Sequence, residues 1–165
     1  MATMQLPLLR VLLAASVLAL AGCDGATKFA AKAELENAKP RPVIGNVLRL
    51  DYTENRDTGF GLLRSLPEDT RLPIILALQS LGSLALIVAL FRRKRFDLYA
   101  AAFALTLAGA LGNLTDRIFR GYVVDFIRVP HWPVFNLADI WITVGIGLAL
   151  LAMLRDRPRP VSSPS

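Results

Sequence analysis

Residues 72–95 read LPIILALQSLGSLALIVALFRRKR, an apolar run that ends abruptly in a basic cluster. The apolar part, Leu72 to Phe91, has about 20 residues, which is the length that a helix needs to cross the hydrocarbon core of a bilayer. A basic cluster directly after a span marks the cytoplasmic side of the membrane. This stretch therefore predicts a transmembrane helix whose carboxyl end faces the cytoplasm.

Three more apolar runs are long enough to cross a membrane. They cover about residues 6–22, 98–114 and 134–154. The chain is 54% hydrophobic, with a mean hydropathy of +0.47, whereas soluble domains are roughly 45–50% apolar. We expect an all-α membrane protein with four transmembrane helices.

The basic clusters orient these spans. Residues 92–95 and the tail after Arg155 are basic and are expected in the cytoplasm, as is the amino terminus. The segments 24–71 and 117–133 then face the other side. Within the first of them, residues 47–53 partly alternate between apolar and polar, which predicts a strand. We expect a small extracytoplasmic β-rich surface subdomain.

The length of 165 residues is enough for one domain, expected over 1–155 and followed by a disordered tail over 156–165. The net charge of +6 does not indicate nucleic-acid binding, because much of it flanks the apolar runs and aromatic–basic interleaving is missing. One Cys and one His are too few for an internal disulfide or a Cys/His zinc site.

The segment Leu20-Ala21-Gly22-Cys23 matches the pattern at which bacterial lipoproteins are lipidated and cut. A lipid-anchored protein is therefore a competing hypothesis. Three further spans already hold the chain in the membrane, so an acyl anchor would add little. We expect Cys23 to be an ordinary small residue of the first helix.

Asn136 and Asp139 lie near the start of the fourth span, three residues apart and therefore on one helix face. An Asp in a membrane helix costs about 2.5–3.5 kcal/mol on insertion scales, so it indicates a functional site. The alternative is that either residue caps the helix. Asp125 lies among apolar neighbours and is expected in a poorly hydrated site, unless it is a turn or surface acid.

If Asp125 and Asp139 meet near the outer membrane face, both cannot ionise cheaply, so they share a proton and one pKa rises. In that state one carboxylate activates water while its protonated partner polarises a peptide carbonyl. The motif H-E-x-x-H of metalloproteases and the runs G-x-S-G and G-x-G-D are missing, and His131 is expected at the surface. A proton-coupled transporter, which usually places such acids near the midplane, and a structural membrane protein remain alternatives.

Asn113 and Arg117 are four residues apart and share a helix face at the outer end of the third span. An Arg there is suited to position a peptide carbonyl or to balance a carboxylate. The alternative is an interfacial Arg that reaches the lipid headgroups beside Asp116. Arg120 fits that second description better.

The motifs around these residues resemble those of the lipoprotein signal peptidase (signal peptidase II) family over about residues 10–152. Residues 24–28 resemble its D-Q-x-T-K segment and residues 52–61 its N-x-G-x-A-F-G stretch. Residues 109–117 match G-x-x-G-N-x-x-D-R, and 124–127 with 135–140 match V-D-F and F-N-x-A-D.

The resemblance implies an aspartic endopeptidase of the bacterial inner membrane, with its site near the outer leaflet and no metal or organic cofactor. It implies that the enzyme cuts before the diacylglyceryl-modified Cys of a prolipoprotein. The expected partners are these substrates and membrane lipids, and we expect a monomer. The implied roles are a catalytic dyad of Asp125 and Asp139; support of the dyad and the substrate backbone by Asn113, Arg117 and Asn136; Asn55 reaching in from the surface loop; and Asp24 and Lys28 near the mouth of the site.

Two positions depart from the family pattern. Gly25 replaces the Gln after the first Asp, and Asp57 replaces the Gly two residues after Asn55. If the backbone at Asp57 needs a positive φ, Asp tolerates it less well than Gly, and the added charge would alter the pH response of the site. Residues 59–61 are expected to close over a bound peptide as a flap, or to form a static platform.

Overall fold

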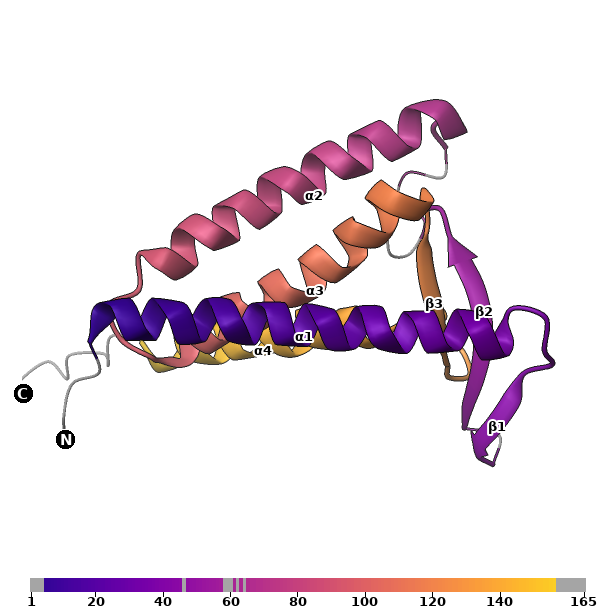
Figure 1. The fold of residues 1–165 in the computed structure, drawn as a ribbon, viewed down its shortest axis with the longest axis horizontal. Coiled ribbons are helices and arrows are strands. Elements are labelled where there is room, and N and C mark those ends of the chain that lie inside the picture. Colours follow the sequence, from indigo (N-terminus) through magenta and orange to yellow (C-terminus); the bar gives the residue numbers. More distant parts are fainter. Residues whose placement is uncertain (1–4, 46, 58–60, 62, 64, 157–165) are drawn as a thin grey trace, which may run out of the picture.

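The computed structural model describes residues 5–45, 47–57, 61, 63 and 65–156. Four long helices lie at shallow angles to one another, and a small sheet crosses their ends on one side (Figure 1). The helices are α1 (Leu6–Leu35), α2 (Glu68–Phe91), α3 (Leu98–Arg120) and α4 (Leu137–Arg155), and the strands are β1 (Arg41–Ile44), β2 (Leu48–Asn55) and β3 (Val123–Arg128).

Each of the four helices is long and apolar enough to cross a membrane. Large apolar side chains such as Leu18, Leu81 and Leu154 are exposed, as expected of surfaces that face lipid rather than water. The prediction of four transmembrane helices with a small β-rich subdomain is thus confirmed. Most of the predicted disordered tail, residues 157–165, lies outside the described residues.

The helices end at different residues from those predicted. α1 continues past residue 22 to Leu35, and α3 continues past residue 114 to Arg120, where Gly121 ends it in a left-handed conformation with φ 78°. Both extensions carry charged side chains that are buried against other helices, so they stay helical although hydropathy falls. α4 begins at Leu137 rather than at residue 134, because Asn136 caps it.

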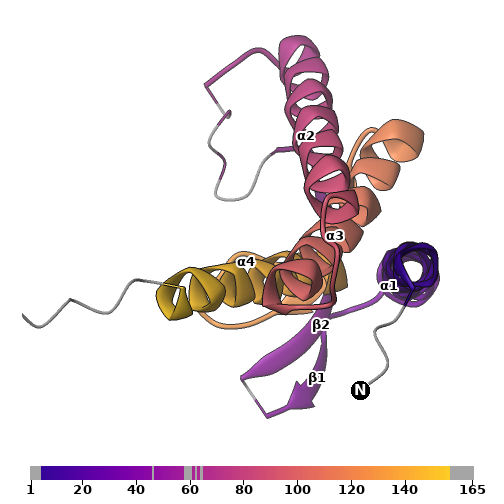
Figure 2. The ribbon, with the colours of Figure 1, turned by 90° about the vertical axis from the view of Figure 1, so that its left-hand side faces the viewer.

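Helix α3 is the central element of the bundle. Figure 2 shows it between α1, α2 and α4. Its small residues Ala100, Ala104 and Ala108 are buried against apolar side chains of α1, which lets the two helices approach closely. The central position allows α3 to present polar side chains to all three neighbours at the end where the sheet lies.

The sheet is antiparallel, with strand order β1-β2-β3. The predicted strand over residues 47–53 corresponds to β2. Strand β3, which carries Asp125, was not predicted from the sequence. In the register of β2 and β3, Thr53 is paired with Asp125 and Asn55 with Val123, which fixes where Asp125 lies relative to α3 and α4.

Two glycines allow α3 and α4 to touch. A Cβ atom on Gly109 would collide with the carbonyl oxygen of Ala138, and one on Gly145 would collide with Thr106 and lie 2.8 Å from the carbonyl oxygen of Ala102. Gly147, two residues further along α4, has no atom within 4 Å of the same position. The two α4 glycines therefore form a matched pair for mutation.

We expect Gly145→Ala to lower the free energy of unfolding by about 1–3 kcal/mol, because the new methyl group must push the two helices apart. Gly147→Ala should leave stability unchanged or raise it slightly, since Ala favours the helix. Denaturant titration in detergent micelles, followed by circular dichroism, measures both. Equal stability of the two variants would show that the close α3–α4 approach is not required.

Candidate active site

Asp125 and Asp139 line one cavity of about 340 Å³ at the sheet end of the bundle. Asp125 comes from the middle of β3 and is 2% exposed, while Asp139 lies in the first turn of α4. Asn113 and Arg117 of α3 also line the cavity. Most of the remaining wall is apolar, with Ile75, Val123, Trp132, Pro133, Val134, Phe135 and Ile142.

Two amide side chains connect the carboxylates. Asn136 Nδ2 donates to Asp125 Oδ1 at 2.6 Å and to Asn113 Oδ1 at 3.1 Å. Asn113 Nδ2 in turn donates to Asp139 Oδ1 at 2.9 Å. The structure thus brings the two predicted dyad residues into one hydrogen-bonded cluster with Asn113 and Asn136.

Asn136 and Asp139 also cap α4, so the alternative interpretation of these residues is true as well. Asn136 Oδ1 accepts from the Asp139 backbone N–H at 3.0 Å, and Asp139 Oδ2 accepts from the Asn136 backbone N–H at 3.2 Å. The reciprocal bonds form a capping box. They hold the Asp139 carboxylate at the amino-terminal end of α4.

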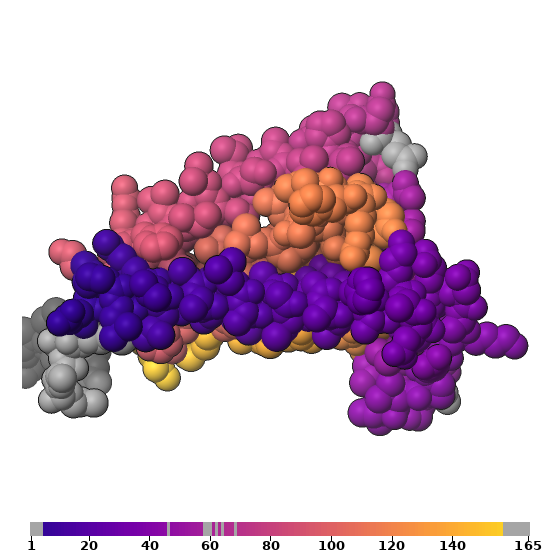
Figure 3. Space-filling view, viewed as in Figure 1, coloured from indigo at the N-terminus to yellow at the C-terminus, as the bar shows by residue number. Residues whose placement is uncertain are grey.

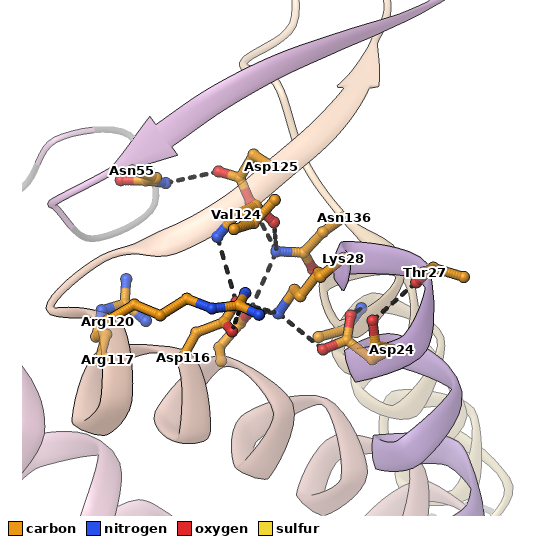
Figure 4. Close-up of polar contacts among 12 residues, drawn as sticks. Asp24, Thr27, Lys28, Asn55, Asp116, Arg117, Arg120, Val124, Asp125 and Asn136 are labelled. Carbon is orange, nitrogen blue, oxygen red and sulfur yellow. Dashed lines mark hydrogen bonds and ion pairs between the residues drawn. The ribbon is translucent and has the colours of Figure 1, made fainter. Parts of the chain in front are cut away.

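Asn55 reaches Asp125 from the sheet. It is the last residue of β2 rather than part of a loop, which corrects the expectation from the sequence. Asn55 Nδ2 donates to Asp125 Oδ2 at 2.9 Å, and its Oδ1 accepts from the Asp57 backbone N–H at 3.0 Å (Figure 4). Both oxygens of Asp125 therefore receive an amide N–H, one from Asn55 and one from Asn136.

Burial raises the pKa of Asp125 to about 7. The hydrogen bonds from Asn55 and Asn136 and the charge of Lys28 oppose this rise in pKa, and the negative charge of Asp139 adds to it. The carboxyl group of Asp125 therefore gains and loses its proton near neutral pH.

Asp24 and Lys28 are fully buried, so they do not lie at the mouth of the site. Lys28 Nζ lies 2.7 Å from Asp24 Oδ2, 3.1 Å from Asp116 Oδ2 and 2.8 Å from Asn113 Oδ1. Asp24 Oδ1 also accepts from the backbone N–H of Ala138, near the start of α4, at 2.8 Å. Figure 4 shows Asp24, Lys28 and Asp116 between α1, α3 and β3.

Asp116 is a member of this cluster that the sequence argument missed. Its Oδ2 accepts from the Val124 backbone N–H at 3.2 Å, next to Asp125, and its Oδ1 accepts from Arg120 at 2.8 Å. Asp116 lies three residues after Asn113 on the same helix face, which is the signal that would have identified it. Arg120 thus pairs with Asp116 rather than extending to the headgroups alone.

Arg117 is 6% exposed and is not a headgroup contact. Its Nη1 donates to Gln79 Oε1 at 3.2 Å and its Nη2 to the backbone oxygen of Asp57 at 2.6 Å. The guanidinium therefore joins α2 to the chain that follows Asn55. Its charge also acts on Asp125 and Asp139 across the cavity.

The two departures from the family pattern cause no strain. His131 is the one non-glycine residue with a positive φ among those that the structure describes, so Asp57 does not need a glycine conformation. The Asp57 carboxylate lies 3.9 Å from Arg71 Nη1, which compensates its charge. A Cβ on Gly25 would meet no atom within 4 Å.

Gly59 and Phe60 lie outside the described residues, so the flap stays a prediction.

Cys23 lies within the continuous helix α1 and is exposed, in agreement with the expected role as an ordinary helix residue. His131 is at the surface, as predicted. No group of three His, Cys, Asp or Glu side chains suited to a metal ion occurs within the part of the chain that the structure describes. The absence of a cofactor stays a prediction.

A sequence profile of the family described as signal peptidase (SPase) II matches residues 16–155. The chain belongs to the signal peptidase II family. It is therefore a peptidase with several membrane spans, and the alternatives of a transporter and of a purely structural membrane protein are set aside. The resemblance seen in the motifs is confirmed.

Proteins described as lipoprotein signal peptidases align over most of the chain. The one from Geobacter metallireducens is 39% identical over 142 residues, which cover 82% of this chain and 86% of that protein. The one from Syntrophotalea carbinolica is 37% identical over 159 residues, covering 93% and 96%.

Two solved structures described as bacterial membrane enzymes share the fold. They have TM-scores of 0.78 and 0.77 at 24% and 25% identity. The first covers 91% of this chain and 94% of its own, and the second 88% and 94%.

Proposed function

We propose that this signal peptidase II is an aspartic endopeptidase that removes the signal peptide from diacylglyceryl-modified prolipoproteins by cutting before the lipidated Cys. The observation that carries the proposal is the pair of carboxylates, Asp125 and Asp139, linked through Asn113 and Asn136 in one largely apolar cavity. The names of the related proteins support lipoproteins as the substrates.

In the proposed reaction Asp125 enters with its proton and donates a hydrogen bond to the carbonyl oxygen of the scissile peptide. Asp139 enters as a carboxylate and takes a proton from a water molecule, whose oxygen then bonds to the carbonyl carbon. The carbonyl oxygen takes the proton of Asp125, which gives a neutral tetrahedral diol. Asp139 then passes its proton to the amide nitrogen as the C–N bond breaks, and Asp125 recovers a proton from the diol.

The substrate is a membrane helix followed by a polar chain, and the surroundings of Asp125 suit both parts. The 340 Å³ cavity has apolar walls on the side of α2 and α4. A second cavity, of about 580 Å³, is lined by Glu54, Arg56, Asp57 and Arg71 and shares Asn55 and Asp125 with the first. We assign the apolar side to the signal peptide and the acyl chains, and the polar side to the residues after the lipidated Cys.

The orientation of the enzyme follows from its charges. The basic residues 92–95 and Arg155 lie at the end of the bundle opposite to the sheet, so the positive-inside rule favours the cytoplasm for that end. The dyad would then lie near the outer leaflet of the bacterial inner membrane. A monomeric enzyme without a cofactor is sufficient for this chemistry.

The proposal is tested by incubating the detergent-purified protein with a diacylglyceryl-modified precursor and with its unlipidated twin, each with and without EDTA. We expect cleavage of the lipidated precursor directly before its Cys, read by mass spectrometry, little cleavage of the twin, and no inhibition by the chelator. Equal cleavage of both precursors, a cut at another bond, or strong inhibition by EDTA would each contradict part of the proposal.

We expect the activity to fall as the pH rises above about 7, because the mechanism needs the proton of Asp125 and its pKa is raised to about 7. Each further pH unit should lower kcat/KM by about tenfold. In Asn55→Ala, which removes a hydrogen bond that lowers this pKa, the loss of activity should begin at a higher pH, whatever the absolute rate. Asn37→Ala, at an exposed position, is the control. An alkaline limb that does not move in Asn55→Ala would contradict the assignment.

A further inference from the structure

Gln79 is the largest polar side chain in the apolar part of α2, between Leu72 and Phe91. The other polar side chains of that stretch are the small hydroxyls of Ser80 and Ser83. A primary amide has two donors and an acceptor, and water is missing from the hydrocarbon core of a bilayer, so such a group needs partners inside the protein or on a ligand. The reaction proposed above gives no role to Gln79.

Gln79 lies on the face of α2 that is turned toward the protein. Ile75, four residues before it, is 2% exposed, and Ser83, four residues after it, is 4% exposed, so the three share one buried helix face. Gln79 itself is half-buried and lines the cavity of about 340 Å³ that holds the two dyad carboxylates. We call this cavity the dyad cavity.

The dyad cavity lies between α2 and α4. Ile75 and Gln79 of α2 line it on one side, and Ile142 and Thr143 of α4 line it on another. Figure 2 shows α2 and α4 on different sides of α3. Seen from the side of α1, atoms of α3 fill the space between α1 and α2 near the sheet (Figure 3). A substrate in the membrane therefore reaches Gln79 from between α2 and α4.

Arg117 determines which way the Gln79 amide is turned. Its Nη1 donates to Gln79 Oε1 at 3.2 Å. A guanidinium has only donors, so the atom of Gln79 that faces it must be the amide oxygen. The amide nitrogen, Nε2, has no hydrogen-bond partner among the residues that the structure describes. It is not a fully buried atom either, so its two N–H groups are accessible from the dyad cavity.

The diacylglyceryl group of the proposed substrate carries acceptors for such a donor. Each of its two ester groups has a carbonyl oxygen that can accept a hydrogen bond, and neither ester has a donor. In the helical part of a signal peptide the carbonyl groups already accept from their own backbone, so they need no donor from the wall of the cavity. An N–H group in a largely apolar wall gains most from an acceptor that is also removed from water.

We propose that Gln79 Nε2 donates a hydrogen bond to an ester carbonyl oxygen of the diacylglyceryl group, which makes Gln79 a specificity-determining residue for the lipidated Cys. The assignment rests on the proposed function, since it takes the lipidated precursor as the substrate. Arg117 holds the amide in the orientation that presents Nε2, and Ile75 and Ile142 contact the acyl chains. The enzyme thereby recognises the oxygen atoms of the lipid as well as its apolar chains.

The test compares two precursors of identical peptide sequence. In one the Cys carries the diacylglyceryl group. In the other it carries a dialkylglyceryl group with ether links and chains of the same length, which lacks both carbonyl oxygens. The value of kcat/KM is measured for each precursor with the detergent-purified enzyme. We expect wild type to cleave both and to prefer the diester by about three- to tenfold, which is the effect of one hydrogen bond.

Gln79→Glu separates the two contacts of the amide. A carboxylate still accepts from Arg117 but has no N–H group to donate. The preference for the diester should therefore fall to about one or below, because the hydrogen bond to the ester is lost. Gln79→Met removes both contacts and should also abolish the preference, with a lower overall rate. Ser80→Ala, at the neighbouring exposed position, is the matched control and should keep the preference.

A general loss of stability or of dyad chemistry changes both rates alike, so it leaves the ratio of the two precursors unchanged. The proposal is wrong if wild type cleaves both precursors equally well. It is also wrong if Gln79→Glu keeps the preference for the diester, since Gln79 would then serve only to hold Arg117. If wild type cleaves neither precursor, the proposed function is itself wrong, and the assignment of Gln79 falls with it.

Discussion

Replacing Asp125 or Asp139 by Asn is expected to slow cleavage of the lipidated precursor by about three orders of magnitude or more. Proton transfer by a positioned carboxyl group typically contributes a factor of about 10²–10⁴, and the proposed reaction uses both carboxyl groups for it. Asn has nearly the same shape as Asp, so the helices and the sheet should keep their arrangement. The loss should appear in kcat, because the cavity that holds the substrate remains.

Each substitution also removes an acceptor. Both oxygens of Asp125 and both of Asp139 accept N–H groups, so the new amide group must turn one N–H toward a donor. We expect a small loss of stability, measured by thermal unfolding in detergent. Asp69→Asn, at an exposed position on α2, is the control for loss of a charge. Processing at the wild-type rate by either dyad variant would remove that residue from the mechanism.

The sequence was sufficient to predict the four spans because apolar runs of that length have few other uses. It was also sufficient to identify four residues as members of one site, because the family motifs contain them: Asn113, Asp125, Asn136 and Asp139. It did not reveal that Asn55 and Asp125 lie on adjacent strands. Strand register depends on contacts between residues 70 positions apart, which no local pattern contains.

The ends of α1 and α3 were predicted too short for a related reason. On a hydropathy scale, charged residues such as Asp24, Lys28 and Asp116 mark the end of an apolar span. In the structure Lys28 pairs with both carboxylates and Arg120 pairs with Asp116, so the charges are compensated inside the protein and the helices continue. A charge in a membrane helix therefore ends the apolar span in a hydropathy plot, but it does not end the helix when its partner lies on another helix.

The capping of α4 and the proposed catalysis use the same residues. Asn136 satisfies the Asp139 backbone N–H through Oδ1, and this orientation leaves its Nδ2 facing Asp125 and Asn113. The cap at the start of α4 therefore also determines which side-chain amide donates a hydrogen bond to each carboxylate. The interpretation of Asn136 as a cap and its interpretation as a site residue describe one arrangement.

Lys28→Met is expected to lower the free energy of unfolding by about 3–5 kcal/mol, because it leaves the buried carboxylates of Asp24 and Asp116 without their shared cation. It should also slow cleavage by the protein that still folds. Lys28 Nζ donates to Asn113 Oδ1, which keeps Asn113 Nδ2 toward Asp139. Without that donor only Asn136 Nδ2 still donates to Asn113 Oδ1, so the orientation of the Asn113 amide is held less firmly.

Two comparisons distinguish a loss of stability from a loss of the Asn113 orientation. Lys32→Met, one turn further along α1, removes a half-exposed lysine that contacts Tyr122, and it should change stability and activity little. Lys28→Met combined with Asp24→Asn removes one of the buried carboxylates, so it should regain stability without regaining the cleavage rate.

The pH profile gives a readout that a purely structural role for Lys28 would not change. The charge of Lys28 lowers the pKa of Asp125, so its removal should move the alkaline loss of activity to higher pH in the double variant. Asp139, Arg117 and Asn55, which also face Asp125, are unchanged in that protein. If the double variant recovers both stability and the wild-type rate, Lys28 serves only to neutralise Asp24 and Asp116, and the orientation of Asn113 must be fixed by Asn136 alone.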